Sequence, residues 1–192
     1  MPAKKSLAML LGSVLLLGSG QLMAGPSATL LGDTCAGCHG TDGASNGPAT
    51  PSIAGLSAEY FNTVMAEYAE DARASTIMGR IARGYTKEEI ALMGDHFAGK
   101  PMKKAKQELD AGKVAAGSKL YKKNCEKCHD EKGALADDDS GLLAGQWLPY
   151  LTYSMEDFRA GHRDMPKKMK KKVKKLSDAQ IEELLQFFAS QQ

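Results

Sequence analysis

The feature that most constrains this chain is a five-residue motif, Cys-x-x-Cys-His, that occurs twice. It spans residues 35–39 and recurs at residues 125–129, and the two copies hold all four cysteines of the 192-residue chain. Two thiols three residues apart on one helical turn can reach the two vinyl groups of one porphyrin, and the histidine that follows can bind the iron. The motif is typical of covalently attached c-type haem, so two copies predict two haems.

Six residues of the two motifs are therefore candidate site residues. The predicted attachment points and proximal iron ligands are Cys35, Cys38, Cys125, Cys128, His39 and His129. Disulfides and a zinc site are the alternatives for four cysteines. A disulfide within each pair does not explain the histidine after it, and the pairs are too far apart for a short zinc ribbon. Two covalently bound haem c groups are the preferred interpretation.

The N-terminus has the layout of a secretory signal peptide. Lys4 and Lys5 precede an apolar run over residues 7–17, and the small residue Ala24 follows. The run is shorter than the ~20 residues of a membrane-spanning helix. We expect cleavage after Ala24, a periplasmic location and no transmembrane segment in the mature chain; a retained membrane anchor is the alternative.

Charge is divided unevenly along the predicted mature chain. Residues 25–112 carry 8 basic and 11 acidic side chains, whereas residues 113–192 carry 15 and 12. The total is balanced, which does not fit a nucleic-acid-binding protein. Seven lysines lie between residues 167 and 175. They are either a solvated helix face or a surface that steers an acidic redox partner.

The repeat extends beyond the two motifs and divides the chain into two units. The offset is 90 residues in the first half of each unit and 91 in the second. Matched pairs include Ala54 with Ala144, Gly55 with Gly145, Tyr60 with Tyr150, Ile90 with Ile181 and Phe97 with Phe188. Units of about 80 residues are small for an independent core, which a covalent haem would stabilise. We predict a signal peptide at 1–24, a first domain at 25–99, a linker at 100–112 and a second domain at 113–192.

Hydrophobic periodicity predicts an all-α fold with no convincing strand. Helices are expected before each cysteine motif, in the middle of each unit and at its end, including residues 113–124, 58–68 and 148–158. The final helices begin with capping-box patterns, Thr86 with Glu89 and Ser177 with Gln180. Residues 99–112 are expected to form the linker and a little irregular helix.

The second axial ligand distinguishes an electron carrier from a catalyst, because methionine closes the iron to small molecules. The chain has ten methionines, and most methionines are packing residues. Met78 lies 39 residues after His39, and Met169 lies 40 residues after His129. Each precedes the final helix of its unit, so these two are the predicted ligands. Met165 is the alternative in the second unit.

Five other residues have positions that allow a role at the haems. Met65 and Met155 match in the repeat but fall within apolar helical patterns, so they are expected to pack in the core. His162 is a possible ligand in a bis-histidine arrangement, but a loop histidine is the preferred interpretation. Trp147 and Tyr150 are candidates for the contact between the haems, with ordinary packing as the alternative.

Several segments of the chain resemble a known family, and they span nearly all of residues 27–192. The segments are residues 35–41, 75–85, 125–129, 144–150, 157–159 and 188–192. The stretches Thr-Ile-Met-Gly-Arg and Ala-Gly-Gln-Trp are the most discriminating. The chain resembles the diheme cytochromes c4, and within that group the cytochrome subunits of flavocytochrome c sulfide dehydrogenases, which consist of tandem cytochrome c-like domains.

The resemblance implies an electron-transfer subunit rather than an enzyme. Such a subunit takes electrons from a separate FAD-containing sulfide dehydrogenase subunit and passes them to a soluble acceptor such as a cytochrome c. The family's axial ligands fall on His39, Met78, His129 and Met169, with Met165 as the alternative to the last. The chain itself has no Gly-rich dinucleotide fingerprint, so the flavin is expected on the other subunit.

Two alternative functions use the same haem residues. One is a free-standing cytochrome c4-like carrier that feeds a terminal oxidase or reductase. The other is a diheme enzyme, such as a peroxidase or a thiosulfate dehydrogenase, which needs an open sixth position on one iron. The matched positions of Met78 and Met169 disfavour the enzyme.

Overall fold

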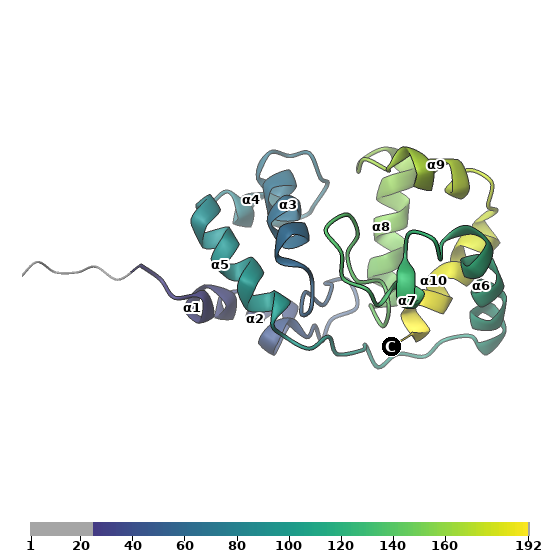
Figure 1. The fold of residues 1–192 in the computed structure, drawn as a ribbon, viewed down its shortest axis with the longest axis horizontal. Helices are drawn as coiled ribbons and strands as arrows, with labels where there is room; N and C mark the ends of the chain where they lie inside the picture. The colour runs from purple at the N-terminus through teal and green to yellow at the C-terminus, as the bar shows by residue number, and fades with distance from the viewer. Residues whose placement is uncertain (1–24, 192) are drawn as a thin grey trace, which may run out of the picture.

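The computed structural model describes residues 25–191, so the predicted signal peptide at 1–24 lies outside the described residues. The chain forms two helical lobes in sequence order, drawn in Figure 1 from purple to teal and from green to yellow. The first lobe contains α1 Ala28–Asp33, α2 Ala36–His39, the 3₁₀ turn η1 Thr41–Gly43, α3 Ala58–Ala69, α4 Met78–Ala82 and α5 Lys87–Ala98. The second contains α6 Ala111–Asn124, α7 Asp130–Gly133, α8 Leu148–Ala160, α9 Lys167–Val173 and α10 Asp178–Ser190.

The all-α fold predicted from the sequence is confirmed. No strand occurs in residues 25–191, where the only β-type pairing is an isolated antiparallel bridge between Arg73 and Arg163. Within the same residues, no helix combines the length and the hydropathy that crossing a membrane requires.

Each lobe has its own hydrophobic core. In the first lobe, α1 and α3 pack against α5, with Phe61, Met93 and Phe97 among the buried side chains. In the second, α6 and α8 pack against α10, around Tyr121 and Phe187. The two cores are separate because each lobe buries the apolar faces of its own helices.

The final helix of each lobe begins with the capping box that the sequence predicts. The Thr86 hydroxyl accepts from the Glu89 backbone N–H, while the Glu89 carboxylate accepts from the Thr86 N–H. Ser177 and Gln180 make the same pair of hydrogen bonds at the start of α10. These bonds satisfy amide groups that the first turn of a helix leaves free, so they fix where α5 and α10 begin.

The turn after each cysteine motif is also repeated. Asp42 and Lys132 both have positive φ, 55° and 62°, and each is followed by a glycine with positive φ. The carbonyl of Gly43 accepts from the Ile53 N–H at 2.8 Å, and that of Gly133 accepts from the Leu143 N–H at 2.9 Å. The left-handed backbone suits glycine, which has no Cβ to clash.

The connection between the lobes differs in one respect from the sequence expectation. No helix forms between Ala98, where α5 ends, and Ala111, where α6 begins, so the irregular helix expected there was wrong. Pro101 has no amide hydrogen to donate to a helix. The segment runs along one edge of the molecule (Figure 1), and the Ala105 N–H donates instead to the Gly145 carbonyl at 2.8 Å.

Candidate haem sites

The first cysteine motif forms the short helix α2, and the second forms a hydrogen-bonded turn directly after α6. The N–H of Cys38 donates to the Cys35 carbonyl at 3.2 Å, and the N–H of His39 donates to the same carbonyl at 2.9 Å. Cys128 and His129 make the matching bonds to the Cys125 carbonyl, at 3.0 and 2.9 Å. Residues spaced three and four apart on a helical turn share a face. Each motif therefore presents two thiols and one imidazole on the same side.

The four cysteines are free thiols rather than disulfides. Cys35 and Cys125 are half-buried, while Cys38 and Cys128 are exposed. Burial raises the pKa of both half-buried thiols, that of Cys125 to about 11. Among residues 25–191, no three His, Cys, Asp or Glu side chains gather as a metal-binding cluster.

His39 is buried and held in a defined orientation. Its side chain is 8% exposed, and its Nδ1 lies 2.8 Å from the Pro51 carbonyl oxygen, to which it can donate. Burial lowers its pKa, which favours the neutral imidazole. A neutral ring that donates from Nδ1 has its Nε2 lone pair available for a metal. These properties fit an iron ligand.

His129 occupies the matching position but lacks the matching hydrogen bond. Its Nδ1 is buried and has no hydrogen-bond partner among the described residues. Gly141 stands where the first unit has Pro51. Burial again lowers the pKa of the ring. The two histidines therefore differ in burial, in backbone conformation and in what orients them: His39 is buried at the end of α2, whereas His129 is half-buried with φ −121° and ψ 71°.

Tyr121 supports the second motif in a way that sequence reasoning did not anticipate. Its hydroxyl donates to the His129 carbonyl at 2.8 Å and accepts from the Lys132 N–H at 2.9 Å. The side chain is only 2% exposed. Leu31 stands at the position 90 residues earlier, so the repeat gave no signal for this contact.

The predicted methionine ligands lie at matching places in the fold. Met78 is the first residue of α4 and packs, half-buried, against the first core. Met169 is half-buried in α9. Each lies eight residues before the N-cap of the final helix, Thr86 or Ser177. Met165 is also half-buried, just before the Pro166 N-cap of α9, so both candidates in the second domain remain predictions.

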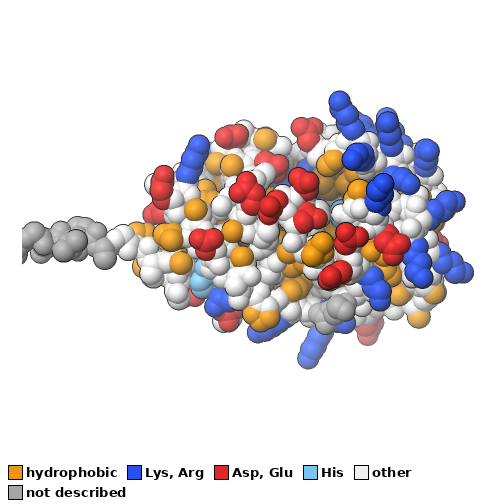
Figure 2. All heavy atoms as spheres, viewed as in Figure 1, with side chains coloured by type: hydrophobic (Ala, Val, Ile, Leu, Met, Phe, Trp, Pro, Cys, Tyr) orange, Lys and Arg blue, Asp and Glu red, His pale blue; other side chains and the backbone are white. Residues whose placement is uncertain are grey.

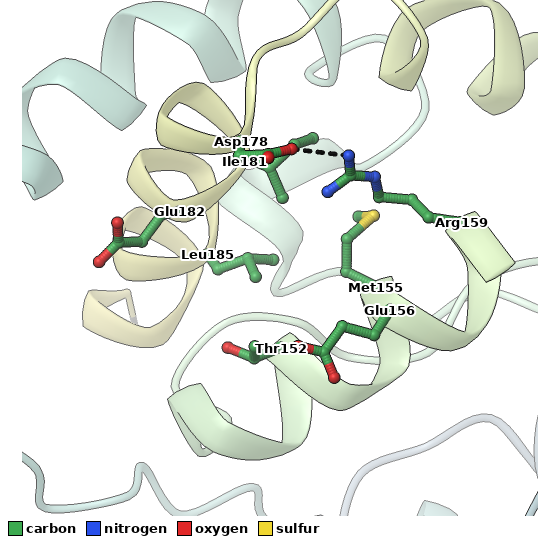
Figure 3. Close-up of a pocket in the computed structure, with 8 residues that line it drawn as sticks. All are labelled: Thr152, Met155, Glu156, Arg159, Asp178, Ile181, Glu182 and Leu185. Carbon is green, nitrogen blue, oxygen red and sulfur yellow. Dashed lines mark hydrogen bonds and ion pairs between the residues drawn. The ribbon is translucent and has the colours of Figure 1, made fainter.

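Met65 and Met155 pack as the sequence analysis expected. Met65 is 4% exposed in the first core, and Met155 packs against the second. Figure 3 shows Met155 between α8 and α10, in a hollow of about 140 Å³ that Arg159 and Asp178 bridge at 2.6 Å. This hollow contains none of the predicted haem-binding residues. His162 is 66% exposed in its side chain and lies 3.6 Å from Asp157.

The two lobes meet through direct hydrogen bonds. The Trp147 indole N–H donates to the Ser45 carbonyl at 3.2 Å, and the Tyr150 N–H donates to the Pro48 carbonyl at 3.1 Å. The Arg163 guanidinium donates to the Tyr60 hydroxyl at 3.2 Å. Trp147 and Tyr150 thus lie at the contact between the domains, and their predicted place between the two haems stays a prediction.

Arg73 is the most buried charged side chain at this contact. It is 7% exposed, donates to the Glu67 carboxylate at 3.2 Å and lies over the Tyr68 ring at 5.3 Å. Its backbone pairs with that of Arg163, which is its own match in the repeat. A buried guanidinium requires such partners to offset its loss of hydration. Arg73 and Arg163 are 90 residues apart, which is the offset of the repeat, so the sequence alone could have identified them as a matched pair.

Comparisons with known proteins agree with this geometry. The profile of the family described as "Cytochrome c" matches residues 26–110. The profile described as "Cytochrome C oxidase, cbb3-type, subunit III" matches residues 112–188. Each lobe thus corresponds to one cytochrome domain.

Individual relatives point in the same direction. The cytochrome subunit of sulfide dehydrogenase from Chlorobaculum tepidum is 44% identical over 103 residues, which cover 46% of this chain and 93% of the relative. Cytochrome c4 from Pseudomonas aeruginosa is 28% identical over 138 residues, 67% of this chain and 68% of the relative. The structure of cytochrome c4 from Pseudomonas stutzeri superposes with a TM-score of 0.75, covering 88% of this chain and 100% of that one at 22% identity.

The motifs, the two equivalent domains and these relatives lead to one assignment. Haem c is the cofactor that the two matched families carry, and in each domain the paired thiols and the histidine that follows them fit it. The chain is an electron-transfer protein rather than a catalytic subunit. It belongs to the c-type cytochrome family of the sulfide dehydrogenase cytochrome subunit, and it has the tandem two-domain fold of the diheme cytochromes c4.

Proposed function

We propose that this chain is the periplasmic electron-transfer subunit of a sulfide:cytochrome c oxidoreductase. It accepts electrons from a separate FAD-containing subunit that oxidises sulfide, and it passes them to a soluble acceptor such as a cytochrome c. The 44% identity to a cytochrome subunit of sulfide dehydrogenase carries this proposal. The relative corresponds in length to about half of this chain, or roughly one domain.

The residues divide into attachment and ligation roles. Cys35 with Cys38, and Cys125 with Cys128, form the thioether bonds that hold one haem c in each domain. With haem bound, His39 and Met78 would hold the iron in the first domain, and His129 and Met169 would hold it in the second. A c-type haem, when bound, supplies an iron that takes up and releases single electrons.

The protein's contribution is to position and enclose these ligands. The Pro51 carbonyl fixes the ring of His39, and burial keeps that ring neutral. Met78 lies against the first core at the start of α4, where it can close the second axial position. The hydrogen bonds from Trp147 and Tyr150 hold the two domains in contact, so electrons can pass between the sites within one chain.

A reconstitution experiment tests the donor. The holoprotein, with both haems attached, is mixed with the flavoprotein subunit of the same organism, and sulfide is added in a stopped-flow spectrophotometer. We expect rapid reduction of both haems and co-elution of the two subunits from a sizing column. Reduction that is equally slow with and without the flavoprotein would reject this donor.

A free-standing cytochrome c4-like carrier is the second candidate. The match to the Pseudomonas aeruginosa cytochrome c4 covers 67% of this chain, which is more than one domain. This coverage favours the free-standing carrier. Such a carrier elutes as a stable species without a flavoprotein, and a membrane fraction that contains a terminal oxidase oxidises it. The sizing column of the first experiment therefore separates the two candidates.

A further inference from the structure

A lysine-rimmed hollow opens on the second domain between α6 and α9. Its volume is about 400 Å³. Three lysines, Lys123, Lys172 and Lys175, contribute to its lining, together with the apolar side chains Leu120 and Leu176. Both leucines also pack against the second core, so the hollow has an apolar part set among positive charges.

The hollow adjoins the second haem-attachment motif. Asn124, which contributes to its lining, directly precedes Cys125 in the chain. Lys172 lies close enough to act electrostatically on the Cys125 thiol. It also belongs to α9, the helix that carries Met169. The predicted second haem site is therefore next to the lysine-rimmed hollow.

The positive charge here is not neutralised by the protein itself. Within residues 25–191, the ion pairs of the second domain involve Lys113, Arg159 and His162, and none involves a lysine of the hollow. Further exposed lysines lie on the same two helices and directly after α9: Lys119, Lys122, Lys167, Lys168, Lys170, Lys171 and Lys174. Figure 2 shows Lys and Arg side chains, drawn in blue, gathered at the end of the molecule where α6 and α9 lie in Figure 1.

The first domain does not present a comparable surface. Its residues have an excess of acidic over basic side chains, whereas residues 113–192 have an excess of basic ones. Asp42 of the first domain is paired with Lys100 of the linker at 2.7 Å, and Arg83 is paired with Asp71 at 3.0 Å. The molecule is thus polarised, and only one end attracts a negatively charged partner strongly.

We propose that the lysine-rimmed hollow is the surface through which electrons leave the chain, and that it docks the acidic face of a soluble electron-acceptor protein. This inference rests on the proposed function, because it supposes that electrons reach the second domain. Unpaired lysines attract a carboxylate-rich surface over a Debye length of about 8 Å at physiological salt. The leucines between them offer apolar contact once the partner has arrived, as at the centre of a protein interface.

The test measures electron transfer to an acidic protein. The reduced diheme holoprotein is mixed with oxidised plastocyanin, a copper protein with an acidic surface, so that each Cu²⁺ takes one electron from the cytochrome. The variants are Lys172→Glu/Lys175→Glu on α9 and Lys123→Glu on α6. The matched control is Lys87→Glu, an exposed lysine of α5 in the first domain. A cationic oxidant, tris(phenanthroline)cobalt(III), is run in parallel.

We expect the double variant to lower the second-order rate with plastocyanin about tenfold at low salt, and Lys123→Glu about threefold. The Lys87→Glu control keeps the wild-type rate, and added salt slows the wild type. With the cobalt complex the order reverses, because the new carboxylates attract a cation. Retention of the far-red methionine-to-iron band in each variant shows that α9 still supplies its ligand.

Three outcomes overturn the docking surface while leaving the electron-transfer function intact. One is an equal plastocyanin rate for wild type and double variant. Another is an equal loss of rate in the Lys87→Glu control. In the third, the double variant no longer co-sediments with phosphatidylglycerol vesicles but reduces plastocyanin at the wild-type rate. That result would identify a lipid surface as the partner of the hollow. A wild-type protein that neither oxidant can oxidise would instead reject the proposed function itself.

Discussion

Gln146 of the second domain makes two hydrogen bonds to the backbone of Ser52 in the first. Its Oε1 accepts from the Ser52 N–H at 3.0 Å, and its Nε2 donates to the Ser52 carbonyl at 2.7 Å. Both residues are 2% exposed, so water does not compete for these groups. One side chain therefore completes the hydrogen bonding of a buried peptide across the domain contact.

Replacement of Gln146 by leucine should loosen this contact. The change leaves a buried N–H and a buried carbonyl unsatisfied, which costs about 2–4 kcal/mol in the free energy of unfolding. Urea denaturation of the holoprotein, followed by tryptophan fluorescence and by haem absorbance, measures the loss. Asn46→Leu is the control, because Asn46 is exposed and its change should stay within about 0.5 kcal/mol. Equal stabilities of the two variants would contradict the assigned role.

The axial methionines have a spectroscopic signature. Oxidised protein with two His/Met haems should show a weak charge-transfer band at the far-red edge of the visible spectrum. Met78→Ala and Met169→Ala should each remove about half of its intensity and lower one reduction potential, since methionine ligation raises the potential.

Met165→Ala is the matched control for the second domain. It removes the alternative methionine of the same segment and should leave the band unchanged. If Met165→Ala removes half of the band while Met169→Ala does not, the assignment of the second ligand is reversed.

The unequal histidines predict unequal haem potentials. Donation from His39 to the Pro51 carbonyl makes that imidazole a stronger electron donor, which stabilises oxidised iron. His129 lacks such a partner among the described residues. We expect the first domain to titrate at the lower potential in a spectroelectrochemical titration. Met78→Ala assigns the steps, because it should shift the lower one only; a shift of the upper step would reverse the order.

Asp110 should contribute a pH-dependent part of the stability of α6. Its carboxylate accepts from the Lys113 N–H at 2.9 Å as the N-cap, and this hydrogen bond holds its pKa below the usual 3.8. A depressed pKa gives stability that is present above pH 3.8 and is lost as the pH falls through the folded value. Asp110→Asn keeps a capping oxygen but does not titrate.

The measurement compares urea denaturation of wild type and Asp110→Asn between pH 2 and 6. Wild type should be the more stable above pH 4, where its charge also favours the helix N-terminus. The difference should vanish in strong acid. A difference that stays constant over the whole range would show that the charge of Asp110 plays no part.

The features that were predicted correctly from the sequence are those that the internal repeat and the helix-start patterns indicate. The helical class, the capping boxes at Thr86 and Ser177, and the core positions of Met65 and Met155 follow from periodicity and local hydrogen bonding. These features depend on residues close in the chain or on matched positions in the two units. Local signals of this kind are readable from one sequence.

Contacts between the domains were not predictable in the same way. Gln146 matches Leu56 in the repeat, and nothing in its neighbours indicates that it binds Ser52. Tyr121 likewise matches Leu31 yet has taken on a polar role beside His129. Such contacts depend on how two lobes come together, which helix periodicity does not describe. The substitution of Pro51 by Gly141 at the matched position was visible, but only the fold shows its effect on His129.

The bridge between Arg73 and Arg163 joins a residue to its own counterpart in the repeat. Such a contact is the mark of an isologous interface, which arises when two identical protomers meet about a twofold axis. At this bridge, the domain contact has the form expected of two fused copies of one domain. When two domains are joined in one chain, their association no longer depends on the protein concentration, because the linker sets their effective concentration. The two redox sites consequently stay paired even in a compartment where the protein is dilute, and the two copies have been free to diverge in charge.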